Sequence, residues 1–224
     1  MTMPTKYDDV AAALVANGYE PVPVARGKKK AIPKDWTHFR HDEREKWPDA
    51  GAGILARYVP CADLDIDDED ASAACEQAVR DALNLGEAAV LPRRIGRHPR
   101  VLLPFRCDVP FPKLRSADYK LRNGTMAHVE ILCDGQQFVA YGVHATTGKP
   151  YIWNGSGDLL SVPRDALPLV DEATARRIVA ACEQVLAEYG ERVQPVARVT
   201  TPAAAARGTI ATGGRNDALA RLVH

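Results

Sequence analysis

The chain has 224 residues, and its 29 lysines and arginines balance 29 aspartates and glutamates, so it lacks the overall positive charge of many nucleic-acid-binding proteins. No apolar run approaches the roughly 20 residues of a transmembrane helix and the N-terminus lacks an apolar signal region, so we expect a cytoplasmic protein without a membrane partner. The five cysteines are widely spaced and include no Cys-x-x-Cys pair, which favours neither a zinc site nor a disulfide framework.

Hydrophobic periodicity predicts both helices and strands. The predicted helices are residues 6–17, 71–84 and 171–189. The predicted extended segments and strands are residues 21–24, 51–58, the start of 61–70, 88–92, 101–105, 129–132, 137–141 and 151–153. Pro104 predicts that the strand 101–105 lies at a sheet edge. The Asp134-Gly135 turn predicts that 129–132 and 137–141 form a hairpin, with 151–153 as a third antiparallel strand.

This order of elements predicts an α+β fold in which helices cover one side of a sheet. We expect residues 1–190 to form the folded domain. The Pro/Ala/Thr-rich composition after Gly190 predicts a flexible linker over 191–209. Residues 210–224 read as the start of a further helical region, which indicates that the chain is a fragment of something longer.

The acidic stretch 61–70 is the most informative part of the sequence. Asp63, Asp65 and Asp67 alternate with apolar residues, so their carboxylates share one face of a strand. Such a face favours Mg²⁺ or Mn²⁺, and alternate strand positions, roughly 6.6 Å apart, suit a pair of metal ions. The alternative is an acidic turn before a helix N-terminus, which explains residues 68–70 better than it explains Asp63 and Asp65.

Three other features are candidates for the same site. Glu130 lies on a predicted strand and is either a third metal ligand or a solvent-facing glutamate. A basic turn with Gly96 at its centre is either a triphosphate-binding loop or a solvated loop. The candidate nucleotide-binding residues in and near this turn are Arg94, Arg97, His98, Arg100 and Arg106. His144 follows a strand and is either structural or a hydrogen-bond donor to a nucleotide.

Four segments together resemble the bifunctional primase–polymerase (Prim-Pol) domain of the archaeo-eukaryotic primase superfamily, of the kind found in phages and mobile elements. These segments are 21–36, the Asp-x-Asp strand at 62–68, the basic motif 94–106, and 129–153. The resemblance implies an N-terminal α/β module packed on an RRM-like catalytic sheet. It also implies that residues 1–190 are the catalytic domain and that 210–224 begin a truncated helical primase domain.

By the same resemblance, Asp63, Asp65 and Glu130 are the metal ligands of a two-metal site for Mg²⁺ or Mn²⁺. An alignment slipped by two residues makes the pair Asp65 and Asp67 instead. His98 corresponds to a histidine that contacts the triphosphate, and Arg100 stands where relatives often carry lysine.

The implied function is template-dependent DNA priming and polymerisation during replication of a phage or mobile element. The implied partners are single-stranded DNA, nucleoside triphosphates and a C-terminal helicase or primase region. Two alternatives stay open: a metal-dependent nuclease, and a non-catalytic single-stranded nucleic-acid-binding module.

Overall fold

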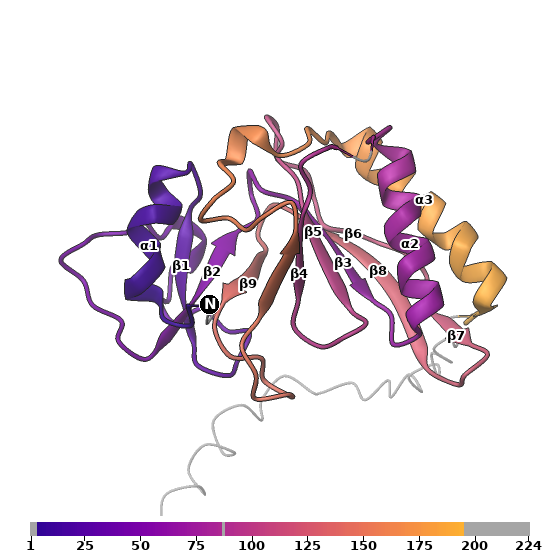
Figure 1. Ribbon diagram of the computed structural model, residues 1–224, viewed down its shortest axis with the longest axis horizontal. Coiled ribbons are helices and arrows are strands. Elements are labelled where there is room, and N and C mark those ends of the chain that lie inside the picture. The colour runs from indigo at the N-terminus through magenta and orange to yellow at the C-terminus, as the bar shows by residue number, and fades with distance from the viewer. Residues whose placement is uncertain (1–3, 87, 195–224) are drawn as a thin grey trace, which may run out of the picture. The chain divides into compact units, whose positions relative to one another are not determined.

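The computed structural model describes residues 4–86 and 88–194, which form the α+β fold that the sequence predicts (Figure 1). The α-helices are α1 (Tyr7–Ala16), α2 (Glu69–Ala82) and α3 (Glu172–Tyr189), and short 3-10 turns cover Trp36–His38 and Arg164–Ala166. The strands are β1 (Pro21–Ala25), β2 (Ala50–Leu55), β3 (Cys61–Asp65), β4 (Pro92–Ile95), β5 (Val101–Pro104), β6 (Leu114–Arg115), β7 (Tyr119–Leu121), β8 (Met126–Leu132), β9 (Gln137–Tyr141), β10 (Ile152–Gly155) and β11 (Gly190–Arg192).

The larger sheet has the strand order β10-β4-β5-β3-β8-β7-β11, with β6 also paired to β8. Neighbouring strands are antiparallel throughout. Helices α2 and α3 cover one face, where Leu64 and Val129 pack in a core with Ile178 of α3 (Figure 1). The prediction of helices on one side of the sheet is therefore confirmed, and the opposite face is left for other contacts.

The smaller sheet has the order β1-β2-β9, and α1 packs on it. Its core contains Tyr7 and Leu14 of α1 and Ile54 of β2. Leu102 and Leu132 of the larger sheet belong to the same core. The smaller sheet thus covers part of the face that the helices leave open.

The predicted hairpin is wrong, although its turn forms. The N–H of Gln136 donates to the carbonyl of Cys133 at 3.1 Å, so the chain does reverse at Asp134-Gly135. However, β8 pairs with β3, β6 and β7, whereas β9 crosses to β2 in the smaller sheet. Four consecutive residues of β9, from Phe138 to Tyr141, are buried, which shows that both faces of this strand are covered. A turn specifies the reversal, but burial of an apolar strand on both faces decides its partner.

Other elements are displaced from their predicted positions. Strand β10 forms as predicted, but it pairs with β4. Strand β5 lies between β3 and β4 and not at an edge; Pro104 permits this because it is the last residue of the strand. The predicted strand 88–92 is shifted to β4, so Arg93 and Arg94 belong to a strand and not to the basic turn. Helix α2 begins at Glu69 and not at residue 71 as predicted. Asp68 caps its N-terminus, since the carboxylate accepts a hydrogen bond from the N–H of Ala71 at 3.0 Å.

The fold continues past residue 190. Strand β11 pairs with β7, so residues 191 and 192, which we expected to open the linker, belong to the sheet. The remainder of that linker from 195 onward and the region 210–224 lie outside the described residues. Among the helices of the described part, none has the length and hydrophobicity needed to cross a lipid bilayer.

Candidate active site

A row of cross-strand neighbours runs over the open face of the larger sheet. Arg94 pairs with Leu102, Leu102 with Asp63, Asp63 with Glu130, and Glu130 with Arg115. Side chains directly opposite each other on antiparallel strands lie on the same face. Pairing of β3 with β8 therefore places the two predicted ligands Asp63 and Glu130 side by side.

Polarity changes along β3 and β8 in steps of two residues. The pair Cys61 and Leu132 is buried in the core shared with the smaller sheet. The next pair on that face is Asp63 and Glu130, and the pair after it is Asp65 and His128. The polar side chains therefore begin where the cover of the smaller sheet ends, and those of Asp63 and Asp65 line the pocket described below.

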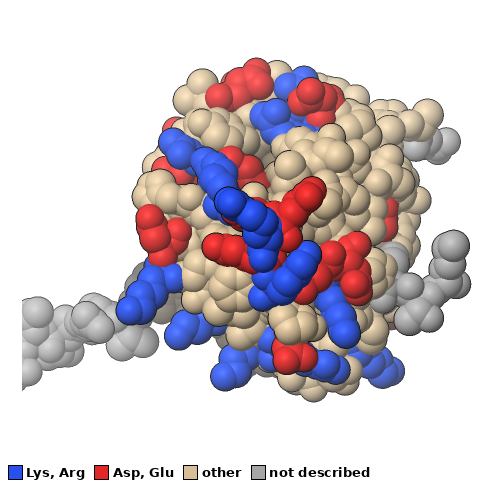
Figure 2. Space-filling model, turned by 90° about the vertical axis from the view of Figure 1, so that its left-hand side faces the viewer, with Lys and Arg blue, Asp and Glu red and all other residues tan. Residues whose placement is uncertain are grey.

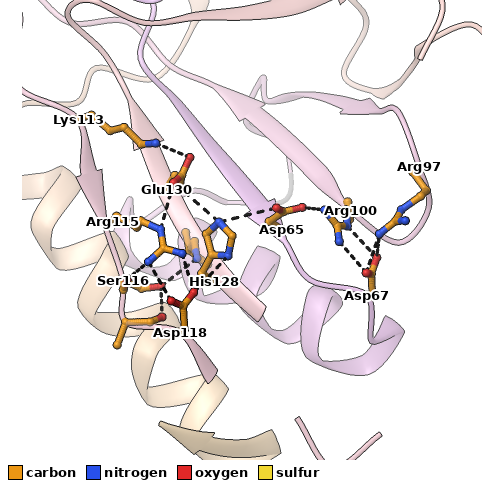
Figure 3. A network of polar contacts seen from close by, with 12 residues as sticks. Asp65, Asp67, Arg97, Arg100, Lys113, Arg115, Ser116, Asp118, His128 and Glu130 are labelled. Carbon is orange, nitrogen blue, oxygen red and sulfur yellow. Dashed lines mark hydrogen bonds and ion pairs between the residues drawn. The ribbon is translucent and has the colours of Figure 1, made fainter. Parts of the chain in front are cut away.

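Glu130 is neutralised by two cations from the segment that leads into and forms β6. The Lys113 ammonium lies 2.7 Å from one carboxylate oxygen of Glu130, and the Arg115 Nε lies 3.2 Å from the other (Figure 3). His128 Nε2 lies 3.8 Å from Glu130 and 3.7 Å from Asp65. Burial and the nearby Arg115 lower the pKa of His128, which favours its neutral form at pH 7.

On the other side, Asp65 faces the basic turn. Arg100 forms ion pairs with both Asp65 and Asp67, and its Nη2 lies 2.6 Å from the latter. The Arg97 guanidinium also reaches Asp67 at 2.6 Å (Figure 3). Burial lowers the pKa of Arg100 while the charge of Asp63 opposes that effect. Asp67 lies beyond the end of β3 and holds the two arginines in place.

A pocket of about 230 Å³ lies next to these carboxylates. Its acidic wall is formed by Asp63 and Asp65. Four cationic side chains also line the pocket, namely Lys29, Arg94, Arg97 and Arg100. A concave site with several cations and a carboxylate wall suits a polyanion that binds together with a divalent cation.

The floor of the pocket is rigid because Arg94 is held from two sides. Only 7% of Arg94 is exposed, and its guanidinium donates to the carbonyl of Val139 in β9. Its Cζ also lies 4.7 Å from the centre of the Tyr151 ring. A Cβ on Gly96 would come within 2.5 Å of Tyr151 and 2.7 Å of His144, so glycine keeps this wall open.

His144 lines the same pocket. Its Nδ1 lies 3.3 Å from both the N–H and the hydroxyl oxygen of Thr147. Burial lowers the pKa of this imidazole, and four nearby cations lower it further. These cations are Lys29, Arg94, Arg97 and Arg100. In the free protein His144 is therefore largely neutral near pH 7.

Two predicted nucleotide-binding residues do not line the pocket. His98 is exposed, and its Nε2 lies 3.8 Å from Glu69 at the start of α2. Arg106 follows β5 at the end where Pro104 pairs with Cys61, which is the end of β3 opposite to Asp65. Its N–H donates to the carbonyl of Pro168, and its guanidinium lies 3.4 Å from Asp108.

Sequence reasoning missed five residues that the fold brings to the site, namely Lys29, Lys113, Arg115, His128 and Tyr151. Lys29 lies in a basic run, but nothing in its spacing relates it to the acidic stretch. The alternation of β8 could have identified His128, since it shares a face with Glu130. The other three become visible only through strand pairing and the closing of the pocket.

The donor set fits a hard divalent cation, because Asp63, Asp65 and Glu130 offer only carboxylate oxygens from adjacent positions. Within residues 4–86 and 88–194, no three His, Cys, Asp or Glu side chains converge closely enough to form a metal cluster. The contacts explain this: Asp65 is turned toward Arg100, and Glu130 toward Lys113 and Arg115. Metal binding therefore requires that carboxylates exchange these partners.

The chain is thus an α+β protein whose antiparallel sheet has helices on one face and, on the other, carboxylates beside a cationic pocket. The family model for the bifunctional DNA primase/polymerase N-terminal domain (Prim-Pol) matches residues 11–169, well over half of the chain. The chain therefore belongs to the Prim-Pol family, as its motifs predicted, and every candidate site residue lies within the match. No curated protein matches the chain.

Proposed function

We propose that this domain is a template-dependent nucleotidyltransferase that extends DNA by two-metal catalysis in the replication of a phage or mobile element. One observation carries the proposal: the pocket lined by four cations opens directly onto Asp63 and Asp65. A triphosphate bound there has its charge balanced by the cations. Its reacting phosphorus then lies beside the carboxylates. Membership of the Prim-Pol family supports the same reaction.

Each residue then has a role that follows from its position. Asp63, Asp65 and Glu130 would hold Mg²⁺ or Mn²⁺, which would supply charge neutralisation for the phosphoryl group and lower the pKa of the attacking hydroxyl. Arg97 and Arg100 bind phosphate oxygens bidentately. Arg94 and Tyr151 form a rigid floor, and positioning of the triphosphate supplies much of the catalysis.

The arginines have an additional consequence for binding order. Arg100 bridges Asp65 and Asp67 in the free protein. A triphosphate competes for this guanidinium and thereby frees the Asp65 carboxylate for a metal ion. Nucleotide and metal are therefore expected to strengthen each other's binding. Calorimetric titration of Mn²⁺ with and without a nucleoside triphosphate measures this coupling, and equal affinities would contradict it.

The decisive experiment is primer extension on a primed single-stranded DNA template with Mg²⁺ or Mn²⁺. We expect extension by the wild type and none by the Asp63→Ala/Asp65→Ala variant. Retained extension by the variant would contradict the ligand assignment. Absence of extension by the wild type on every template would favour a non-catalytic binding module.

A metal-dependent nuclease is the second candidate, because it can use the same carboxylates. It needs no pocket for a triphosphate, so Arg97→Ala distinguishes the two functions. The variant should lose nucleotide incorporation under the polymerase proposal. Under the nuclease alternative, cleavage of DNA should persist in the same variant.

A further inference from the structure

The carboxylates of Asp65 and Glu130 lie between two separate groups of cations (Figure 3). Arg97 and Arg100 lie on the pocket side, next to Asp65 and Asp67. Lys113 and Arg115 lie on the opposite side, against Glu130. The register fixes this order, since Arg94 and Leu102 flank Asp63 on one side and Glu130 and Arg115 on the other.

The geometry of phosphoryl transfer suggests that the two groups of cations bind different parts of the reactants. In phosphoryl transfer, the attacking and leaving oxygens lie roughly in line on opposite sides of the reacting phosphorus. A triphosphate in the pocket places its leaving pyrophosphate toward Arg97 and Arg100. The attacking hydroxyl then approaches from the side of β8 and β6.

We propose that Lys113 and Arg115 bind the last internucleotide phosphate of the strand that is being extended, and so position its 3′-hydroxyl. The proposal rests on the proposed function and adds where the growing strand lies. It gives the growing strand a direction over the sheet, from β6 toward the pocket.

The burial and contacts of these residues suit a phosphate ligand. The side chains of Lys113 and Arg115 are 35% and 40% exposed, whereas that of Glu130 is 18% exposed. Lys113 loses its carboxylate partner once Glu130 binds a divalent cation, and the Nε side of the Arg115 guanidinium is freed at the same time, which leaves positive charge at an open surface. Arg115 stays in place because its Nη2 lies 2.6 Å from Asp118.

The side of the molecule that carries α1 shows no broad basic area. Lysine and arginine side chains alternate there with aspartate and glutamate (Figure 2). This agrees with the zero net charge of the chain.

Affinity for DNA gives the first test. We would measure binding of a primed template to the Lys113→Ala/Arg115→Ala variant by fluorescence anisotropy at several salt concentrations, without nucleotide and with Mn²⁺. We expect affinity to fall about tenfold or more and the salt dependence to become shallower. Nucleotide affinity should stay unchanged, and Lys113→Arg should keep wild-type affinity. Arg177→Ala is the matched control because it removes a cation from α3, on the far face of the sheet.

Site-directed crosslinking gives the second test. All five native cysteines are buried, so Lys113→Cys introduces a selectively reactive thiol. A primer carrying a haloacetyl group on its last internucleotide phosphorothioate should label Lys113→Cys. It should not label Lys29→Cys, whose new thiol lies on the pocket side.

The outcomes separate this proposal from the proposed function. Unchanged DNA affinity of the double alanine variant, or stronger labelling of Lys29→Cys than of Lys113→Cys, overturns the growing-strand site. If the wild type still extends primers in that case, the proposed function stands alone. If the wild type neither binds nor extends primed DNA, both proposals fall.

Discussion

Asp63 and Glu130 lie directly opposite each other on β3 and β8, with like charges on adjacent antiparallel strands. Glu130 has Lys113 and Arg115 as ion-pair partners. Asp63 has no ion pair within residues 4–86 and 88–194 and lines the pocket. Like charges in this arrangement repel each other; Lys113 and Arg115 balance the charge of Glu130, and the proposed metal ion would balance that of Asp63.

The first prediction concerns this repulsion. Asp63→Asn should change the stability of the metal-free protein by no more than about 0.5 kcal/mol, because the repulsion from Glu130 that it removes is offset by the attraction to Arg100 that it also removes. The same variant should lose primer extension and should no longer be stabilised by Mn²⁺. Urea unfolding with and without Mn²⁺ measures both effects. Equal Mn²⁺ stabilisation of variant and wild type would place the metal elsewhere.

The second prediction distinguishes Asp63 from Asp67 as a metal ligand. Asp67 lies outside β3 and holds Arg97 and Arg100, so we expect Asp67→Asn to weaken nucleotide binding and keep extension within about tenfold of wild type. Asp63→Asn should reduce extension far more. Single-nucleotide incorporation at saturating nucleotide compares the two variants. Normal activity of Asp63→Asn with loss in Asp67→Asn would make Asp65 and Asp67 the ligand pair.

The third prediction concerns the wall of the pocket at Gly96. A methyl group there would lie 2.5 Å from Tyr151 and 2.7 Å from His144. Gly96→Ala should therefore lower the free energy of unfolding by about 1–3 kcal/mol and weaken nucleotide binding about tenfold. Calorimetry and urea unfolding measure these effects. Gly86→Ala is the matched control, because nothing lies within 4 Å of its added Cβ.

The fourth prediction concerns Arg94, which links the two sheets through the carbonyl of Val139. Arg94→Met keeps most of the side-chain volume but leaves that carbonyl without its donor. We expect a loss of about 1–3 kcal/mol of unfolding free energy. Arg93→Met should cost less, since Arg93 makes a partly buried ion pair with Glu76 of α2 and its loss leaves no carbonyl between the two sheets without a donor. A larger loss for Arg93→Met would show that Arg94 does not hold the sheets together.

The fifth prediction concerns pH. Burial and the cations Lys29, Arg94, Arg97 and Arg100 lower the pKa of His144 in the folded protein, and Tyr151 packs against its ring. The unfolded chain therefore binds this proton more readily, so the stability that neutral His144 contributes is complete above its ordinary pKa of about 6.5. It is lost as the pH falls below that value.

Urea unfolding at pH 7.5 and pH 5.0 tests this sign. The wild type should lose more stability between the two conditions than His144→Asn, because other titrating groups are common to both proteins. An equal loss in the two proteins would mean that His144 titrates alike in the folded and unfolded states.

The fold was predictable where the signal is local. Apolar periodicity identified α1 and α3, since each buries one face against a sheet. The pairing of β9 was not predictable from the Asp134-Gly135 turn, because burial against residues distant in sequence decided it. The position of β5 inside the sheet was not predictable from Pro104 either. Proline lacks the N–H of a ladder hydrogen bond, but Pro104 is the last residue of the strand, so only its end is affected.

By itself, the sequence determined the family, the α+β class and the shared face of Asp63 and Asp65, because motif spacing and the two-residue period of a strand are local properties. Only the tertiary structure decided which side chains meet those carboxylates. It brought Glu130 opposite Asp63, closed the pocket with Lys29 and Tyr151, and left His98 and Arg106 outside it. Register and sheet partner are set by burial over the whole chain, so no local pattern contains them.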